Sequence, residues 1–122
     1  MIETLKGFPA DAVAVRCRGY VSKVDYDEVL APAVERALKA HEKLRLYYEI
    51  APDFSGIAPG AVWEDFWIGM RSLNRWERIA VVTDVAWIKR LVQLFGFLLP
   101  KATRVFAVPE SGKARAWLSQ DS

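Results

Sequence analysis

An unbroken apolar run, Ile79-Ala-Val-Val82, lies in the second half of the chain. A run this short, with two adjacent valines, is typical of a strand that is buried on both faces. Asp84 follows it where a helix N-cap would stand, and a helical apolar pattern begins at Val85. The stretch therefore predicts a central strand over about 78–83 that leads into a helix, as in a parallel α/β unit.

Two other segments, 12–18 and 43–50, alternate between apolar and polar residues, as strands with one polar face do. A short first strand within 1–6 and a last strand at 103–108 are predicted as well. In 43–50, for example, leucine and isoleucine alternate with lysine, arginine, tyrosine and glutamate. Because doubly covered strands are usually apolar throughout, this pattern predicts helices mainly on one face of the sheet.

Apolar residues at helical spacing predict four helices. They cover residues 22–40, 61–73, 85–95 and 110–119. The first begins with Ser22-Lys-Val-Asp25, a helix-start signature, and contains Pro32, which removes a hydrogen bond and predicts a bend. The order of elements predicts one α/β domain over residues 1–122, with a mostly parallel sheet of about five strands laid down in sequence.

Composition removes several classes of protein from consideration. A net charge of +2 is far from the basic excess of a nucleic-acid-binding protein. The single cysteine, Cys17, excludes an internal disulfide and favours a reducing compartment. The first residues lack the apolar region of a signal peptide, and no apolar run approaches the roughly 20 residues of a membrane-spanning helix. We therefore expect a cytoplasmic protein that does not bind nucleic acid.

The residues that could carry chemistry form no catalytic or metal-binding signature. His41 and Cys17 are single residues of their kinds and give no ligand cluster, and His41 falls at a helix end where the dipole favours a cation. Ser55, His41 and Asp84 could form a triad on paper, but no nucleophile-elbow motif surrounds Ser55. Glycine-rich phosphate-binding motifs are absent as well. We expect no enzymatic activity, no metal and no cofactor.

Polar residues follow two neighbouring strands of the predicted sheet. Asp53-Phe-Ser-Gly56 comes after the strand at 43–50, and Asp84 comes after the central strand. Since parallel strands end at the same edge of a sheet, these loops should lie side by side. The predicted ligand-binding residues are Asp53, Phe54, Ser55, Asp84 and Trp87. A polar turn and a helix cap would explain the same residues without a ligand.

The second half of the chain has more apolar residues than one buried stripe on each helix requires. The surplus residues are Trp63, Trp67 and Ile68 on one predicted helix and Trp87, Leu94, Phe97 and Leu98 on and after the next. Lys89 and Arg90 flank the second group. Burial within the domain, a homodimer interface and contact with a membrane or lipid each explain such a face, and the sequence leaves the three open.

Several motifs resemble those of the SpoIIAA-like family of bacterial proteins, which are related in fold to STAS domains and to lipid-binding CRAL-TRIO domains. They are Arg78-Ile-Ala-Val-Val-Thr-Asp-x-x-Trp-Ile88, the closing Ala114-x-x-Trp-Leu118, Gly19-Tyr-Val-Ser-Lys-Val-Asp-Tyr26 and Pro32. The resemblance covers nearly the whole chain. It implies a sheet with helices packed on it, no established enzymatic activity, association with a membrane surface and a pocket for a small ligand.

The resemblance to STAS domains implies a second function. STAS anti-sigma-factor antagonists are phosphorylated on a serine that precedes a glycine in a loop after a strand. Ser55-Gly56 and Asp53 match that loop, whereas Phe54 departs from it. The first hypothesis is therefore a non-enzymatic module for an apolar or lipid-like ligand or a membrane surface, peripheral to the membrane in the latter case. The alternative is a regulatory interaction protein switched by phosphorylation of Ser55.

Overall fold

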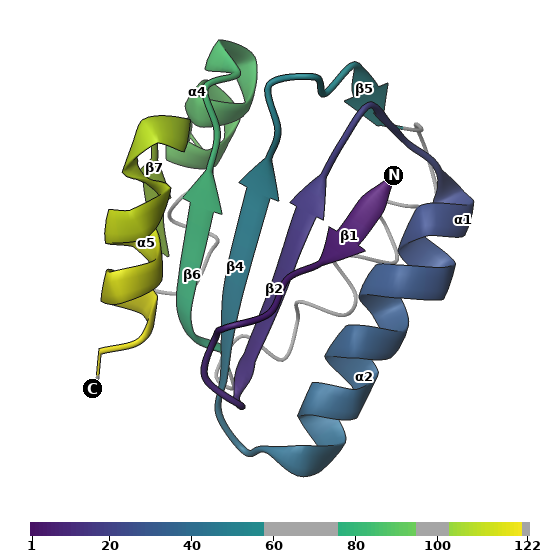
Figure 1. Cartoon of the computed structure of the whole chain (residues 1–122), viewed down its shortest axis with the longest axis vertical. Helices are drawn as coiled ribbons and strands as arrows, with labels where there is room; N and C mark the ends of the chain where they lie inside the picture. The colour runs from purple at the N-terminus through teal and green to yellow at the C-terminus, as the bar shows by residue number, and fades with distance from the viewer. Residues whose placement is uncertain (58–75, 95–102, 121–122) are drawn as a thin grey trace.

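A five-stranded sheet forms the centre of the computed structural model, which describes residues 1–57, 76–94 and 103–120 (Figure 1). Its strands are β1 (Ile2–Thr4), β2 (Ala12–Cys17), β4 (Leu44–Ile50), β6 (Trp76–Val82) and β7 (Thr103–Phe106), in that spatial order. β1 is antiparallel to β2 and the other neighbours are parallel. The predicted α/β fold, with strands laid down in sequence and a central strand between its two predicted neighbours, is confirmed.

A second, smaller pairing was not predicted. β3 (Tyr20–Val21) and β5 (Gly56–Ile57) form a two-residue parallel ladder beyond the ends of β2 and β4. Gly56 stands at a φ of 154°, in a region that favours glycine, and Tyr20 lies against it. Such a short ladder has no periodicity that a sequence pattern could reveal.

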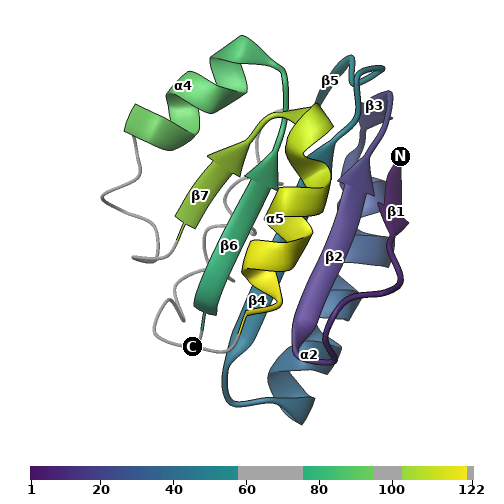
Figure 2. The same ribbon diagram turned by 60° about the vertical axis from the view of Figure 1, so that its left-hand side comes forward.

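The helices cover both faces of the sheet unequally (Figure 2). The helical segments are α1 (Lys23–Asp25), the π-helical turn η1 (Tyr26–Leu30), α2 (Ala31–Ala40), α4 (Ala86–Leu94), the 3₁₀ turn η4 (Val108–Glu110) and α5 (Ser111–Leu118). Residues of η1, α2 and α4 join the core on one face, and in the described part of the chain α5 and Val108 of η4 pack on the other. The predicted helix at 61–73 lies outside the described residues.

Alternate residues of each strand enter two different cores. Val15, Leu46 and Val81 face the core shared with η1 and α2. Their neighbours along the strands face α5 and pack with Ala114 and Leu118; they are Ala14, Tyr47, Ala80, Val82 and Phe106. Because successive side chains point to opposite faces of a strand, the two cores divide the sheet residues cleanly.

The polar face of β4 is buried, which corrects the expectation that it meets solvent. Arg45, Tyr47 and Glu49 are 7%, 2% and 7% exposed and lie on the side that α5 covers. Arg45 donates to the carbonyls of Leu118 and Gln120, and Glu49 accepts from Tyr47. Charged groups are tolerated under α5 because they find partners there, which a single-strand pattern cannot show.

The first predicted helix is continuous, and Pro32 is accommodated by a widened turn. η1 precedes α2, and Ala31 N–H donates to the carbonyl of Tyr26, five residues earlier. Proline lacks an N–H and its ring clashes with the carbonyl four residues before it, so a π turn in front of Pro32 relieves both problems. At the other end, Ser22 and Asp25 form the predicted capping box.

Replacing Asp25 with alanine is expected to lower the free energy of unfolding by about 1 kcal/mol at neutral pH, the usual contribution of a helix cap. The backbone N–H of Ser22 is the main cause of a lowered pKa for Asp25 in the folded protein. The carboxylate therefore stabilises the fold above the ordinary aspartate pKa, and this contribution is lost as the pH falls through the lowered value. Urea denaturation of both proteins from neutral to acidic pH should show the difference shrinking on acidification; a pH-independent difference would contradict the assignment.

Candidate functional site

Four loops meet at the carboxyl end of the parallel strands (Figure 1). Arg18 and Gly19 follow β2, Asp53 to Ser55 follow β4, Asp84 follows β6, and Ala107 follows β7. Ligands of parallel α/β sheets commonly bind at this end. The five predicted ligand-binding residues all belong to segments at this end of the sheet.

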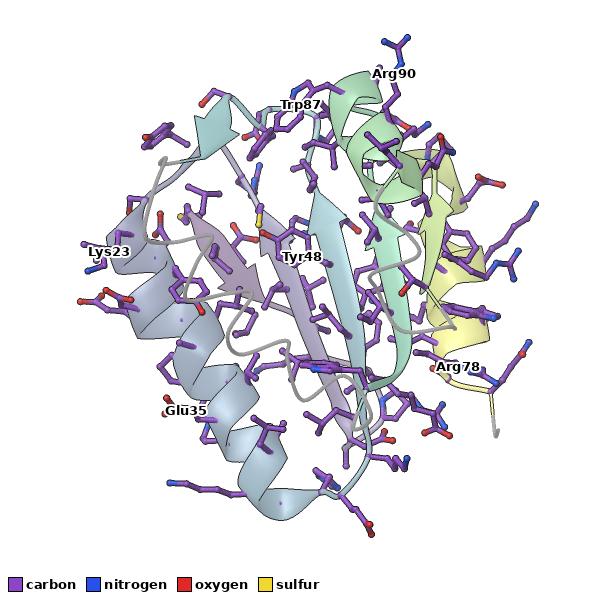
Figure 3. All side chains as sticks on the ribbon, turned by 180° about the vertical axis from the view of Figure 1, so that it is seen from behind. Lys23, Glu35, Tyr48, Arg78, Trp87 and Arg90 are labelled. Atoms are coloured by element: carbon purple, nitrogen blue, oxygen red, sulfur yellow. The ribbon has the colours of Figure 1, made fainter. Side chains whose placement is uncertain are left out.

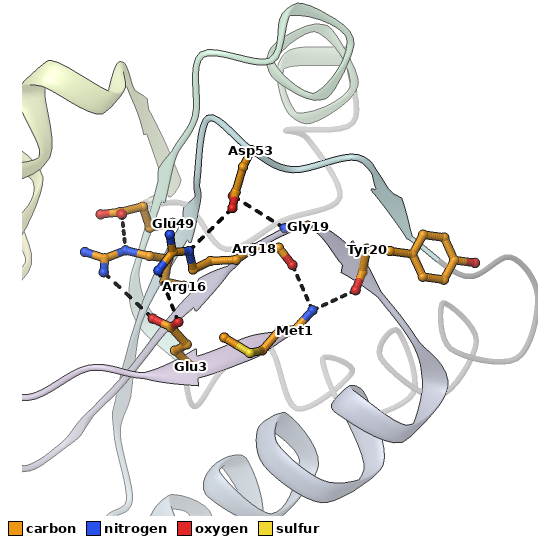
Figure 4. A network of polar contacts seen from close by, with 8 residues as sticks. All are labelled: Met1, Glu3, Arg16, Arg18, Gly19, Tyr20, Glu49 and Asp53. Atoms are coloured by element: carbon orange, nitrogen blue, oxygen red, sulfur yellow. Dashed lines mark hydrogen bonds and ion pairs between the residues drawn. The ribbon is translucent and has the colours of Figure 1, made fainter.

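The loop after β4 is tied to the loop after β2. Asp53 Oδ1 accepts a long hydrogen bond of 3.4 Å from Gly19 N, and Asp53 Oδ2 lies 3.6 Å from Arg18 Nε (Figure 4). Ser55 N donates to the carbonyl of Gly19 at 2.8 Å, while the residue as a whole is exposed. Phe54 is half-buried against the core on the α2 face. The loop is thus fixed by its backbone and by Asp53.

Asp84 is tied to the opposite neighbour. Its Oδ1 accepts from Val108 N at 3.0 Å, which joins the loop after β6 to the loop after β7. Thr83 Oγ1 accepts from Val85 N at 3.0 Å, and Lys89 N donates to the carbonyl of Val85. The expected role of Asp84 as the cap of α4 is therefore wrong: its carboxylate hydrogen-bonds to another loop, and the first helical bond starts one residue later.

The two acidic residues share one end of the molecule and hold different loops. Asp53 fixes the loop after β4 toward β2, and Asp84 fixes the loop after β6 toward β7. Ser55, two residues after Asp53, and Trp87, three residues after Asp84, are both exposed. The grouping of Asp53, Phe54, Ser55, Asp84 and Trp87 around one ligand stays a prediction.

A cleft of about 350 Å³ lies at the other end of β2. It separates the end of α2 from the edge of the sheet and is lined mostly by small residues. The lining residues are Thr4, Leu5, Ala10, Ala12, Val13, Ala14, Ala33, Arg36, Ala37, Ala40 and His41. None of the predicted ligand-binding residues lines it, so this cleft and the predicted site are separate.

The outer face of α4 is apolar and exposed. Ile88 is 9% exposed and Val92 packs against the core, whereas Trp87 and Leu94 are 52% and 67% exposed. Arg90 is three residues from Trp87 and four from Leu94, so the three share one stripe. Figure 3 shows Trp87 and Arg90 on α4. This stripe contains the described part of the predicted membrane or dimer face; Trp63, Trp67, Ile68, Phe97 and Leu98 lie outside the described residues.

Other exposed apolar residues belong to the same end of the molecule as α4. In the described part of the chain, the large hydrophobic residues that are exposed are Met1, Tyr20, Val24, Trp87 and Leu94. The Met1 amino group donates to the carbonyls of Arg18 and Tyr20, which places it where β2 ends. Tyr20 and Val24 belong to β3 and α1, which follow directly. All five therefore belong to segments that begin at the carboxyl end of the sheet; we call these five residues the carboxyl-end surface.

A chain of ion pairs crosses β1, β2 and β4 on the α5 side. Arg16 Nε donates to Glu49 Oε2, and Tyr47 Oη donates to Glu49 Oε1 at 2.6 Å. Glu3 lies 3.9 Å from Arg16 and 3.4 Å from Arg18 (Figure 4). Burial and the neighbouring Glu49 carboxylate raise the pKa of Tyr47. The sequence places an arginine in one predicted strand and a glutamate in another. That Arg16 and Glu49 face each other follows only from the pairing of β2 with β4, so the sequence alone could not reveal this network.

The structure also places the residues that could carry catalysis or bind a metal. Cys17 is 1% exposed, and burial raises its pKa to about 11, so it is a thiol at neutral pH. His41 ends α2, before β4 begins, whereas Ser55 follows β4, so the whole strand separates these two members of the triad considered on paper. In residues 1–57, 76–94 and 103–120, no three His, Cys, Asp or Glu residues gather as a metal site would require.

None of the helices formed by the described residues is long and apolar enough to cross a bilayer.

Comparisons with known proteins agree with the architecture. The sequence profile of the SpoIIAA-like family matches residues 12–119. The chain belongs to the SpoIIAA-like family. A crystal structure of an uncharacterised protein of the DUF3478 family from Shewanella loihica PV-4, described as having a SpoIIAA-like fold, superposes with a TM-score of 0.71. The two chains are 19% identical over 96% of this chain and 93% of the other, which shows a shared fold. No curated protein matches the sequence.

Proposed function

We propose that this SpoIIAA-like protein is a non-enzymatic binding module that docks on a membrane surface, or on a lipid-like ligand, through its carboxyl-end surface. The observation that carries the proposal is that the exposed large hydrophobic residues of the described chain all belong to segments that begin at one end of the sheet. Single exposed apolar residues are ordinary, but several of them on segments that share one end of a small domain favour an interaction surface.

The outer stripe of α4 has the composition of an interfacial helix. Trp87 and Leu94 supply apolar area, and the exposed Arg90 between them supplies a cation. Tryptophan is favoured where an apolar medium meets water, and arginine is attracted to anionic lipid headgroups. The helix is docked on the sheet through Ile88 and Val92, so its outer face is presented without further ordering.

The test is flotation with vesicles of phosphatidylcholine and phosphatidylglycerol, with light scattering of the same samples. Wild type is expected to float, and a Trp87→Ser, Leu94→Ser double variant should lose at least about tenfold in partitioning, because two apolar side chains are removed from the contact. Lys39→Ser, an exposed change on α2, is the control and should behave as wild type. Native mass spectrometry of the purified protein tests for a co-purifying lipid-like ligand.

Two outcomes would overturn the membrane arm of the proposal. If wild type and the double variant both stay with the soluble fraction as monomers, the stripe is not a membrane contact. If wild type is a dimer and the double variant is a monomer, the stripe is a homodimer interface instead.

A second function is supported by the surroundings of Ser55. Ser55 is exposed, and Asp53 in the same loop lies 3.6 Å from Arg18. A phosphate on Ser55 could replace Asp53 as the ion-pair partner of Arg18. Under this function, a serine kinase that acts on the protein would modify Ser55, and a partner would bind the Ser55→Glu and wild-type forms differently. Unchanged partner binding after stoichiometric phosphorylation of Ser55 would remove this function from consideration.

A further inference from the structure

Besides Arg45, which pairs with Asp11 and Glu77, the strand arginines on the α5 side of the sheet fall into two groups. Over β1 and β2, Arg16 and Arg18 are neutralised by Glu3, Glu49 and Asp53. Over β6 and β7, Arg78 and Arg104 have no ion pair with a carboxylate in the described part of the chain. The second group therefore leaves positive charge that the described part of the chain does not neutralise.

Both guanidinium groups lie over the indole ring of Trp117. Arg78 Cζ and Arg104 Cζ each lie 5.4 Å from the centre of the Trp117 ring. Arg104 also lies 5.2 Å from the ring of Phe106, and Arg78 Nη1 donates to the carbonyl of Trp117. Contact with the indole restrains both guanidinium groups, and the planar N–H fork of a guanidinium is suited to binding anionic oxygens. Two unneutralised cations on one ring also repel each other, so an anion that binds both is favoured.

Among the described residues, β7 is the last strand of the sheet and pairs with β6 alone. Figure 2 shows α5 over the middle of the sheet and β7 at the side, beyond β6. Thr83 N donates to the carbonyl of Phe106, so the backbone groups of Phe106 and Arg104 point toward β6. The alternation of a strand then points the N–H and C=O of Val105 away from the sheet. We call Arg78, Arg104, Val105, Phe106 and Trp117 the β7 ledge.

We infer that the β7 ledge binds an extended acidic segment of a partner protein. A peptide lying along β7 would exchange hydrogen bonds with Val105 and place its carboxylates beside Arg104 and Arg78. A peptide fits better than nucleic acid because only a peptide supplies the backbone amide that Val105 requires. The net charge of +2 also gives little of the general attraction on which nucleic-acid binding depends. The ledge and the carboxyl-end surface share no residue, so this inference is independent of the proposed membrane contact.

The probe is a fluorescein-labelled eight-residue peptide of alternating glutamate and valine, titrated with the protein at low salt and followed by fluorescence anisotropy. Arg104→Gln is expected to weaken binding about tenfold, the usual loss on removing one charge-assisted contact. Arg104→Lys should restore only part of it, because lysine keeps the charge and lacks the planar fork. Arg36→Gln, which changes an exposed arginine on α2, is the matched control and should bind as wild type.

Backbone NMR provides a readout that does not depend on the label. The amide resonance of Val105 should shift when the glutamate–valine peptide is added and should not shift with the corresponding lysine–valine peptide. Absence of binding at millimolar concentration, or binding that Arg104→Gln leaves unchanged, would overturn the inference. Arg104-dependent binding of oligo-dT in preference to the acidic peptide would also overturn it and would make the ledge a nucleic-acid site.

Discussion

Replacing Val81 with aspartate is expected to leave the protein unfolded at room temperature. Val81 is 9% exposed in β6, between β4 and β7, and packs into the core shared with η1 and α2. The described residues that pack in that core are hydrophobic, so the new carboxylate would be buried without a partner among them. Such burial costs several kcal/mol, against a total stability of about 5–15 kcal/mol for a domain of ordinary stability.

Circular dichroism and urea denaturation of the Val81→Asp protein check this result. The control is Val24→Asp, the same substitution at a residue that is 59% exposed in the first turn of α1. It should change the free energy of unfolding by less than about 0.5 kcal/mol, as exposed substitutions usually do. A soluble Val81→Asp protein with a cooperative unfolding transition would show that β6 is not buried as described.

Replacing Arg45 with alanine is expected to lower the free energy of unfolding by about 3–5 kcal/mol, the usual cost of removing one partner from a buried charge network. The side chain of Arg45 is 9% exposed; its Nε lies 3.4 Å from Asp11 and 3.5 Å from Glu77. Its Nη1 donates to the carbonyls of Leu118 and Gln120, at and beyond the end of α5. Without Arg45, two carboxylates lose their shared cation and the end of α5 loses its anchor.

Urea denaturation monitored by circular dichroism measures this loss. Arg36→Ala, an exposed arginine on α2, provides the comparison and should cost less than about 1 kcal/mol. A loss for Arg45→Ala as small as that of the comparison would mean that water replaces the guanidinium, and that α5 is held by its apolar contacts alone.

The candidate site was predicted in part. The placement of Asp53, Ser55 and Asp84 at one end followed from the rule that parallel strands end together, which needs only the order of elements. The partners of Asp53 and Asp84 could not be predicted, because Gly19 and Val108 belong to loops distant in sequence. The pairing of Arg78 and Arg104 on Trp117 was not predicted for the same reason: it joins three elements.

The sequence by itself determined the five strands of the main sheet, their order, and the helices at 22–40, 85–95 and 110–119. Alternation defined β2 and β4, the apolar run defined β6, and Ser22 and Asp25 defined the start of the first helix, because each signal acts between residues close in the chain. Only the tertiary structure decided that Arg45 and Glu49 are buried. An alternating strand looks the same whether its polar face meets water or a helix, and α5, more than sixty residues further on, supplies the carbonyls that make burial of Arg45 possible. Burial and pairing depend on which distant segments meet, and single-sequence periodicity contains no information about that.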